Sequence, residues 1–150
     1  MVSDGGILAG RAVAEEVEVI LAGDPRWLRL ARGVVQEFLA QTGFDAQQRE
    51  EITVAVGEAV ANVIRHACKG DARQKFCLLC REGNGAVEIE LRDHGEPFDA
   101  PKEPASPPDE TRAGGRGIFM MQAIMDEMKY TRQGNTNSVR MKKYLSDETG

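Results

Sequence analysis

The chain has 150 residues, three cysteines and a formal charge of −5 at neutral pH. This length is typical of one domain with its own core. The negative charge argues against nucleic acid as the main partner, because phosphate contacts need a basic face. No apolar run is long enough to span a membrane, and the first residues lack a secretory signal. Three cysteines without such a signal are typical of the cytoplasm, where we expect this protein.

The first part of the chain is predicted to form a strand and a helix. Residues 1–12 are expected to be a flexible arm, and residues 15–21 alternate between apolar and acidic side chains, which indicates a half-buried strand. Asp24 is expected to cap a helix with Pro25 at its first position, and this helix should end at Gly43. The side chains expected inward are Val17, Val19 and Leu21 on the strand, and Leu28, Ala31, Val35 and Leu39 on the helix.

A second helix is predicted over residues 50–68. Asp45 and Gln48 before it have the spacing of a capping box, and apolar residues recur within it at the helical period. Four polar residues follow one another at spacings that place them along one side of this helix. A carboxylate, a carboxamide and cations beside a buried stripe favour a ligand site, and the alternative is a solvated helix face. The four are Glu58, Asn62, Arg65 and His66.

Two strands are predicted next, over residues 74–82 and 86–93. A turn of Gly83-Asn84-Gly85 should join them as a hairpin. In the second strand, Val87, Ile89 and Leu91 are expected on the inward face, and Glu88, Glu90 and Arg92 on the other face. Asp93 has the parity of the inward set, so its carboxylate is expected to face the layer of the second helix. An acid in that position needs a hydrogen-bond donor.

The last third is predicted to contain a lid, a helix and a second hairpin. Five prolines make the stretch of residues 95–117 irregular, and so long a loop, with a lid at about residues 97–114, is usually functional or disordered. A glycine cluster then opens a helix, which exposes N–H groups that suit phosphate. A hairpin across Gly134-Asn135 follows, and residues 146–150 should fray. The helix should turn Ile118, Met121, Ile124, Met125 and Met128 inward. This order predicts an α+β fold, with a mixed, mostly antiparallel sheet and helices on one face.

Several familiar motifs are excluded. No glycine-rich run ends in Gly-Lys-Ser/Thr, so the chain has no P-loop, and Gly115-x-Gly117 lacks the third glycine of a dinucleotide site. Cys77 and Cys80 are three residues apart on a strand and should point to opposite faces, which argues against a shared zinc ion. Neither histidine lies on a dimerising phosphoacceptor helix, so a histidine kinase is disfavoured.

Three motifs together resemble those of the GHKL (Bergerat-fold) ATPases. They are Glu58-Ala-Val-Ala-Asn62 with His66, Asp93-His-Gly95-Glu-Pro-Phe-Asp99, and Gly115-Arg-Gly117. Within that superfamily the chain looks most like the bacterial anti-sigma factor serine/threonine kinases. The likeness runs over about residues 15–145, so the ATP-binding kinase domain is expected over residues 13–145. It implies a two-layer α/β sandwich that holds ATP between the sheet, the central helix and a flexible lid.

The resemblance also implies a role for each site residue. Asn62 would coordinate Mg²⁺, and Glu58 would be the general base for a substrate serine. Asp93 would accept a hydrogen bond from the adenine amino group, and Gly95 would let the backbone approach the base. Pro97 departs from the family, because many members have a second glycine there. The other implied nucleotide contacts are Arg65, His66, Phe98, Gly115, Arg116, Gly117 and Ile118.

The function implied by the resemblance is that of a switch in transcription. The chain would use Mg-ATP to phosphorylate a serine on an anti-anti-sigma (STAS-type) partner, would sequester a sigma factor when that partner is unavailable, and would be a homodimer. The alternative is an ATP-gated protein-binding module without phosphotransfer. Glu58 favours the kinase, because a binder needs Asn62 and Asp93 but no base beside them.

Overall fold

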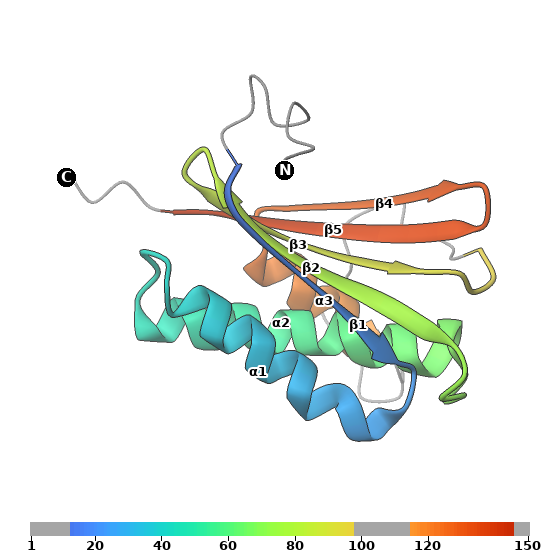
Figure 1. Cartoon of the computed structure of the whole chain (residues 1–150). Coiled ribbons are helices and arrows are strands. Elements are labelled where there is room, and N and C mark those ends of the chain that lie inside the picture. The colour runs from blue at the N-terminus through green and yellow to red at the C-terminus, as the bar shows by residue number, and fades with distance from the viewer. Residues whose placement is uncertain (1–12, 98–114, 146–150) are drawn as a thin grey trace, which may run out of the picture.

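A computed structural model describes residues 13–97 and 115–145. Within them, five strands form one antiparallel sheet in the order β1-β2-β3-β5-β4, and helices cover one of its faces (Figure 1). The predicted two-layer α+β fold is confirmed, although every described strand pairing is antiparallel rather than mixed. The strands are β1 (Val13–Ala22), β2 (Lys75–Gly83), β3 (Ala86–Asp93), β4 (Glu127–Gln133) and β5 (Thr136–Tyr144), and the α-helices are α1 (Leu28–Leu39), α2 (Ala46–Asn62) and α3 (Gly115–Ile124).

The predicted arm and tail, and all of the predicted lid except Pro97, lie outside the described residues. In the part of the chain that is described, no helix combines the length and apolar character needed to cross a membrane. Two hairpins confirm the predicted turns. The turn between β2 and β3 uses Asn84 and Gly85 with φ of 56° and 71°, the left-handed conformation that a tight hairpin requires.

The chain enters α1 as predicted but leaves it earlier. Asp24 Oδ1 accepts a hydrogen bond from Arg26 N at 3.0 Å and caps a 3₁₀ turn over Pro25–Trp27, which leads into α1. The helix ends at Leu39, four residues before Gly43, because the Thr42 hydroxyl donates to the Leu39 carbonyl at 2.6 Å. In β1, Val17 alternates with Val19 and Leu21 as predicted, but it is 40% exposed, whereas Leu21 is buried.

The central helix has the predicted start and an unpredicted end. Gln48 N donates to Asp45 Oδ1 at 2.7 Å and Asp45 N donates to Gln48 Oε1 at 3.1 Å, which completes the capping box. The helix does not continue unbroken to residue 68. Residues 63–67 form a π-helical turn, in which Cys68 N donates to Val63 O at 2.9 Å.

The core lies between the helices and the inner face of the sheet. Met125 and Met128 both contact the core, as predicted. Contrary to the prediction, they do not belong to α3, because that helix ends at Ile124. Burial of these side chains stabilises the layers by roughly 25 cal/mol per Å² of apolar surface removed from water. The fully buried residues of the core include Ala31, Val35 and Leu39 from α1, Ile52, Val56 and Val60 from α2, and Leu78, Ile89, Leu91 and Met141 from the strands.

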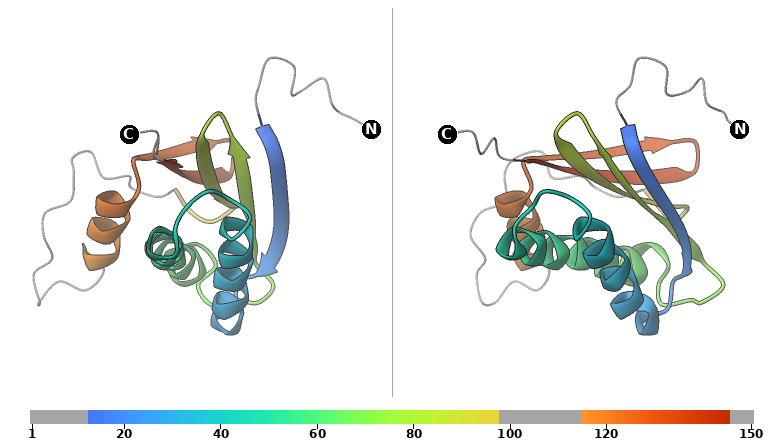
Figure 2. Two further views of the ribbon diagram at one scale, coloured as in Figure 1. Left: turned by 90° about the vertical axis from the view of Figure 1, so that its left-hand side faces the viewer. Right: turned by 60° about the vertical axis from the view of Figure 1, so that its left-hand side comes forward.

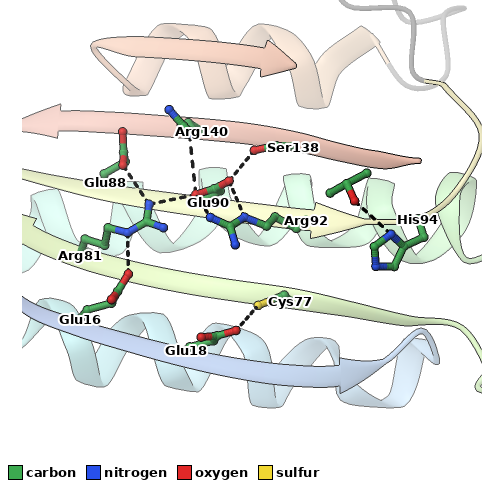
Figure 3. A network of polar contacts seen from close by, with 11 residues as sticks. Glu16, Glu18, Cys77, Arg81, Glu88, Glu90, Arg92, His94, Ser138 and Arg140 are labelled. Carbon is green, nitrogen blue, oxygen red and sulfur yellow. Dashed lines mark hydrogen bonds and ion pairs between the residues drawn. The ribbon is translucent and has the colours of Figure 1, made fainter. Parts of the chain in front are cut away.

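The outer face of the sheet contains a buried carboxylate, that of Glu90, on the face of β3 predicted for it. The side chain does point outward, but it is only 1% exposed. Arg81 Nη1 donates to it at 2.9 Å and Arg92 Nε at 2.8 Å, while Ser138 Oγ donates at 2.6 Å and Arg140 Nε lies 3.7 Å away (Figure 3). Alternation predicts on which face of the sheet a side chain lies. It does not predict whether side chains from neighbouring strands cover that side chain.

These contacts determine the charge of Glu90. Burial alone would raise the pKa of its carboxyl, because it disfavours the charged form. Hydrogen bonds from Arg92, Ser138 and Arg81 outweigh burial and lower the pKa from 4.5 to about 2. Glu90 is therefore ionised at neutral pH, although it is buried.

Cys77 and Cys80 point to opposite faces of the sheet, as predicted. Cys80 is part of the core, whereas Cys77 Sγ donates to Glu18 Oε2 at 3.2 Å on the outer face (Figure 3). Burial raises the pKa of both thiols to about 12, with the Glu18 hydrogen bond adding to the effect at Cys77. Among residues 13–97 and 115–145, no cluster of three or more His, Cys, Asp or Glu side chains could hold a metal ion.

Candidate functional site

A cavity of about 400 Å³ lies between the C-terminal end of α2, α3 and strands β3, β4 and β5. In Figure 2, α2 lies between α1 and α3 beneath the sheet, so the cavity is on the helix side. Cavities of this size are typical of small-molecule and cofactor sites. The polar side chains that line it include Asn62, His66, Asp93, Tyr130, Arg132 and Asn137.

Asp93 is the buried acid of this cavity, and its inward orientation is confirmed. The carboxylate is 7% exposed. Gly95 N donates to Asp93 Oδ1 at 2.9 Å, and Asn137 Nδ2 donates to the same oxygen at 2.8 Å. None of the described residues donates to Oδ2. One carboxylate oxygen is therefore held by the protein, and the other remains an acceptor for a ligand.

The segment after β3 is in close contact with the π-helical turn. A Cβ atom at Gly95 would lie 2.7 Å from Ala67 Cα and 2.8 Å from both Ala67 Cβ and the Ala67 carbonyl oxygen, so only glycine fits. Lys69 Nζ and Glu96 Oε2 form an ion pair at 2.9 Å between the same two segments, and this hydrogen bond lowers the pKa of Glu96. Both side chains are exposed, so the pair contributes little to stability.

The four polar residues of the central helix do not all reach the cavity. Asn62 and His66 line it together with Asp93. Arg65 is not among the cavity-lining residues, but its Nη2 donates to Asn62 Oδ1 at 2.8 Å. Glu58, one turn before Asn62, is partly buried and is also absent from the lining. The structure therefore brings Asn62, His66 and Asp93 together and leaves Glu58 and Arg65 beside them.

Helix α3 begins at Gly115, as predicted from the glycine cluster. The first N–H groups of a helix have no partner within it, so those of Gly115, Arg116 and Gly117 are available to an anion. Met121 of the same helix lines the cavity. Phe98 and the side chains of Arg116 and Ile118 lie outside the described part of the chain.

Sequence reasoning missed Asn137 and Arg132, which belong to the site. Asn137 lies directly opposite Asp93 in the β3–β5 register, and Arg132 Nη1 donates to Asn137 Oδ1 at 2.9 Å. A signal was present, because Asn137 shares the parity of Val139 and Met141 on β5. A polar residue in an inward series calls for a buried partner.

Known proteins of similar sequence identify the family of this chain. A family described as the histidine kinase-like ATPase domain matches residues 21–143. The chain is 28% identical over 140 residues to serine-protein kinase RsbW of Oceanobacillus iheyensis, covering 88% of each protein. It is 25% identical over 143 residues to serine-protein kinase RsbW of Bacillus subtilis, covering 90% of this chain and 89% of that protein.

Two solved structures share the fold. The RsbU and RsbW domains of Rv1364c from Mycobacterium tuberculosis superpose with a TM-score of 0.66 at 19% identity, covering 91% of this chain and 34% of that one. The Acinetobacter baumannii histidine kinase AdeS superposes with a TM-score of 0.50 at 11% identity, covering 87% and 68%. The predicted superfamily is confirmed, and the predicted class of serine-protein kinase agrees with the names of the RsbW relatives. The chain belongs to the histidine kinase-like ATPase domain family.

Proposed function

We propose that residues 13–145 form an ATP-dependent protein serine kinase of the anti-sigma factor type. In this proposal the chain transfers the γ-phosphoryl group of Mg-ATP to a serine on a STAS-type anti-anti-sigma protein, and binds a sigma factor when that protein is unavailable. It would act in the cytoplasm as a homodimer. The names of the RsbW relatives, which span nearly the same length, support the serine kinase.

The observation that carries the proposal is the pair of polar groups in one cavity. Asp93 presents a buried carboxylate with one oxygen left for a donor. A 6-amino purine has an exocyclic amino group that can donate to this oxygen, whereas a 6-oxo purine has an acceptor at the same position. Asn62 lines the same cavity from α2, and the first turn of α3 has N–H groups without partners in the helix, which would suit phosphate. These positions support a base at Asp93 and phosphates between Asn62 and α3.

The residues of the cavity fit a Mg²⁺ ion bound together with phosphates. Asn62 Oδ1 is a hard oxygen ligand with two lone pairs, of which one accepts a hydrogen bond from Arg65 Nη2 at 2.8 Å and the other would face the ion. In nucleotide sites Mg²⁺ takes only one or two protein oxygens, and phosphates and water provide the others. One amide oxygen is therefore sufficient. When bound, the ion would neutralise charge on the phosphates.

Glu58 is assigned as the general base. It precedes Asn62 by one helical turn, so its carboxylate stays close to the proposed phosphate end without being a metal ligand. It would hold the proton of the serine hydroxyl as the oxygen attacks phosphorus. A base of this kind contributes about 10²–10⁴-fold to the rate.

Two variants test the pocket. Asn62→Ala should abolish the Mg²⁺-dependent part of ATP affinity and leave part of the base recognition intact. Asp93→Asn exchanges an acceptor for a group that can also donate, so it should weaken ATP and ADP alike. Isothermal titration with and without Mg²⁺ measures both effects. If both variants bound Mg-ATP as tightly as the parent protein, the pocket assignment would be wrong.

One observation favours a second candidate, the ATP-gated binding module. Glu58 is not among the residues that line the cavity, and a binding module needs no base. Glu58→Gln separates the two functions, because glutamine keeps the size of the side chain but cannot take the proton. The kinase predicts normal ATP and partner binding with most phosphotransfer lost in a single turnover. Equal single-turnover transfer by the parent and the variant would rule out Glu58 as the base.

The partner can be identified from its dependence on nucleotide. The tagged full chain is used to capture proteins from the source cell with ATP, with ADP or without nucleotide, and the captured proteins are searched for phosphoserine. The kinase predicts a captured protein that gains phosphate on serine in the presence of ATP. Nucleotide-dependent capture without any phosphorylation would support the binding module.

A further inference from the structure

Among the site residues that the structure describes, Asn137 joins the most groups by hydrogen bonds. It is 7% exposed, and its Nδ2 donates to Asp93 Oδ1 at 2.8 Å, to the Glu96 carbonyl at 2.9 Å and to the Gly95 carbonyl at 3.2 Å. A buried amide requires such partners, because an unsatisfied one is costly. One side chain therefore connects the acid of the cavity to the backbone that follows it.

Arg132 determines which way round this amide lies. Its Nη1 donates to Asn137 Oδ1 at 2.9 Å and to the Gly95 carbonyl at 3.0 Å. A flipped amide would place its oxygen against the Asp93 carboxylate and two carbonyl oxygens, and its NH₂ group against a guanidinium. Both contacts would be repulsive. Arg132 therefore keeps the NH₂ group of Asn137 directed at Asp93.

The two donors on Asp93 act on the same oxygen. Asn137 Nδ2 and Gly95 N both donate to Oδ1, so rotation of the carboxyl group would break two hydrogen bonds. No described residue donates to Oδ2. The carboxylate is thus held in one orientation and remains an acceptor on the side that is left for a ligand.

We propose that Asn137, supported by Arg132, is a positioning residue for nucleobase selection at Asp93. This inference rests on the proposed function, since it requires a nucleotide in the cavity. Asn137 fixes the orientation of Asp93 and holds the carbonyl groups of Gly95 and Glu96 in place. The site then discriminates between an exocyclic amino group, which can donate to Oδ2, and an oxo group, which cannot.

The exchange of Asn137 for aspartate makes this role visible as a pH dependence. In Asn137→Asp, two carboxyl groups would lie where a hydrogen bond of 2.8 Å now joins the side chains. Two carboxylates this close share a proton, which raises one pKa of the pair, while the Arg132 guanidinium, now 2.9 Å from Asn137 Oδ1, opposes that rise. At low pH the shared proton restores a donor to Asp93, whereas at high pH the two charges repel each other.

The experiment compares ATP with inosine triphosphate, which has an oxo group in place of the amino group. Dissociation constants of both, with Mg²⁺, are measured by titration calorimetry for the full chain, Asn137→Ala and Asn137→Asp. We expect Asn137→Ala to weaken ATP by about tenfold, the value of roughly one hydrogen bond, and to leave inosine triphosphate nearly unchanged. We expect Asn137→Asp to bind ATP weakly at pH 8 and to regain affinity for ATP at pH 6. Asn135→Ala, in the exposed β4–β5 turn, is the matched control and should retain the parent's ratio.

The outcomes separate this inference from the proposed function. If the parent protein bound neither nucleotide, both would be overturned, whereas equal binding of the two nucleotides would overturn the inference alone. If the parent preferred ATP and Asn137→Ala lost affinity for both nucleotides equally, Asn137 would be structural and not a positioning residue. Should Asn137→Ala fail to fold, Arg132→Gln keeps the test open, because Arg132 is exposed. It should lower the ATP preference in the same direction, and an unchanged preference would overturn the proposal.

Discussion

The buried carboxylate of Glu90 leads to a quantitative prediction about stability. Its pKa is lowered from 4.5 to about 2, and one pKa unit corresponds to about 1.4 kcal/mol. The ionised group therefore contributes about 3 kcal/mol to the free energy of unfolding at neutral pH. Since the pKa is depressed in the folded state, this contribution is complete above pH 4.5 and is lost as the pH falls toward 2.

Glu90→Gln tests this value, because it removes the charge and keeps the shape. We expect the variant to lose about 3 kcal/mol at pH 7, since three arginines would retain their charge without a central partner. The matched control is Glu88→Gln. Glu88 also binds Arg81, at 3.0 Å, but it is 25% exposed and should contribute less than about 1 kcal/mol.

The assay is urea unfolding followed by circular dichroism between pH 3 and pH 8. The difference in free energy of unfolding between the parent protein and Glu90→Gln should stay constant from pH 5 to pH 8 and become smaller below pH 4.5. The reasoning would be refuted if Glu90→Gln were no less stable than Glu88→Gln, or if the difference at pH 3 equalled the difference at pH 7.

Two further predictions concern close packing and thiol reactivity. Gly95→Ala places a Cβ atom 2.7 Å from Ala67 Cα, so it should destabilise the fold by about 1–3 kcal/mol and weaken nucleotide binding in calorimetry. Gly33→Ala in α1, where no atom beyond the neighbouring helix backbone lies within 4 Å of the added Cβ, should instead gain up to about 1 kcal/mol; equal effects of the two would contradict the packing argument. Because the pKa values of Cys77 and Cys80 are about 12, only about 10⁻⁴ of each is thiolate at pH 8. Mass spectrometry should find that iodoacetamide alkylates these two thiols slowly until guanidinium unfolds the chain. Rapid labelling of either thiol in the native protein would disprove this.

The sequence predicts most of the fold because the signals for its elements are local. The capping box at Asp45, the turn at Asn84 and the alternation of β3 each lie within a few residues, and each is confirmed. The inward orientation of Asp93 follows from the same alternation. Motif spacing also places Asn62 and Asp93 at one cavity.

What the sequence does not predict depends on distant pairing. Asn137 meets Asp93 across 44 residues, and this contact follows only when the register of β3 and β5 is known. Glu90 is buried because Arg81 of β2 and Arg140 of β5 reach it from two sides. The pairing and register of the strands determine both contacts, and no local sequence pattern predicts that register.

The π-helical turn at residues 63–67 has a consequence for the comparison of this chain with its relatives. Such a turn is equivalent to one residue inserted into an α-helix. Each helical residue advances the chain by about 100°, so the extra residue leaves Asn62 in phase with α2 and rotates every later side chain by that angle. Ala67, the last residue of this turn, is the residue that meets Gly95. We therefore expect a relative with a regular α-helix at this position to place a different side chain against the segment that follows β3.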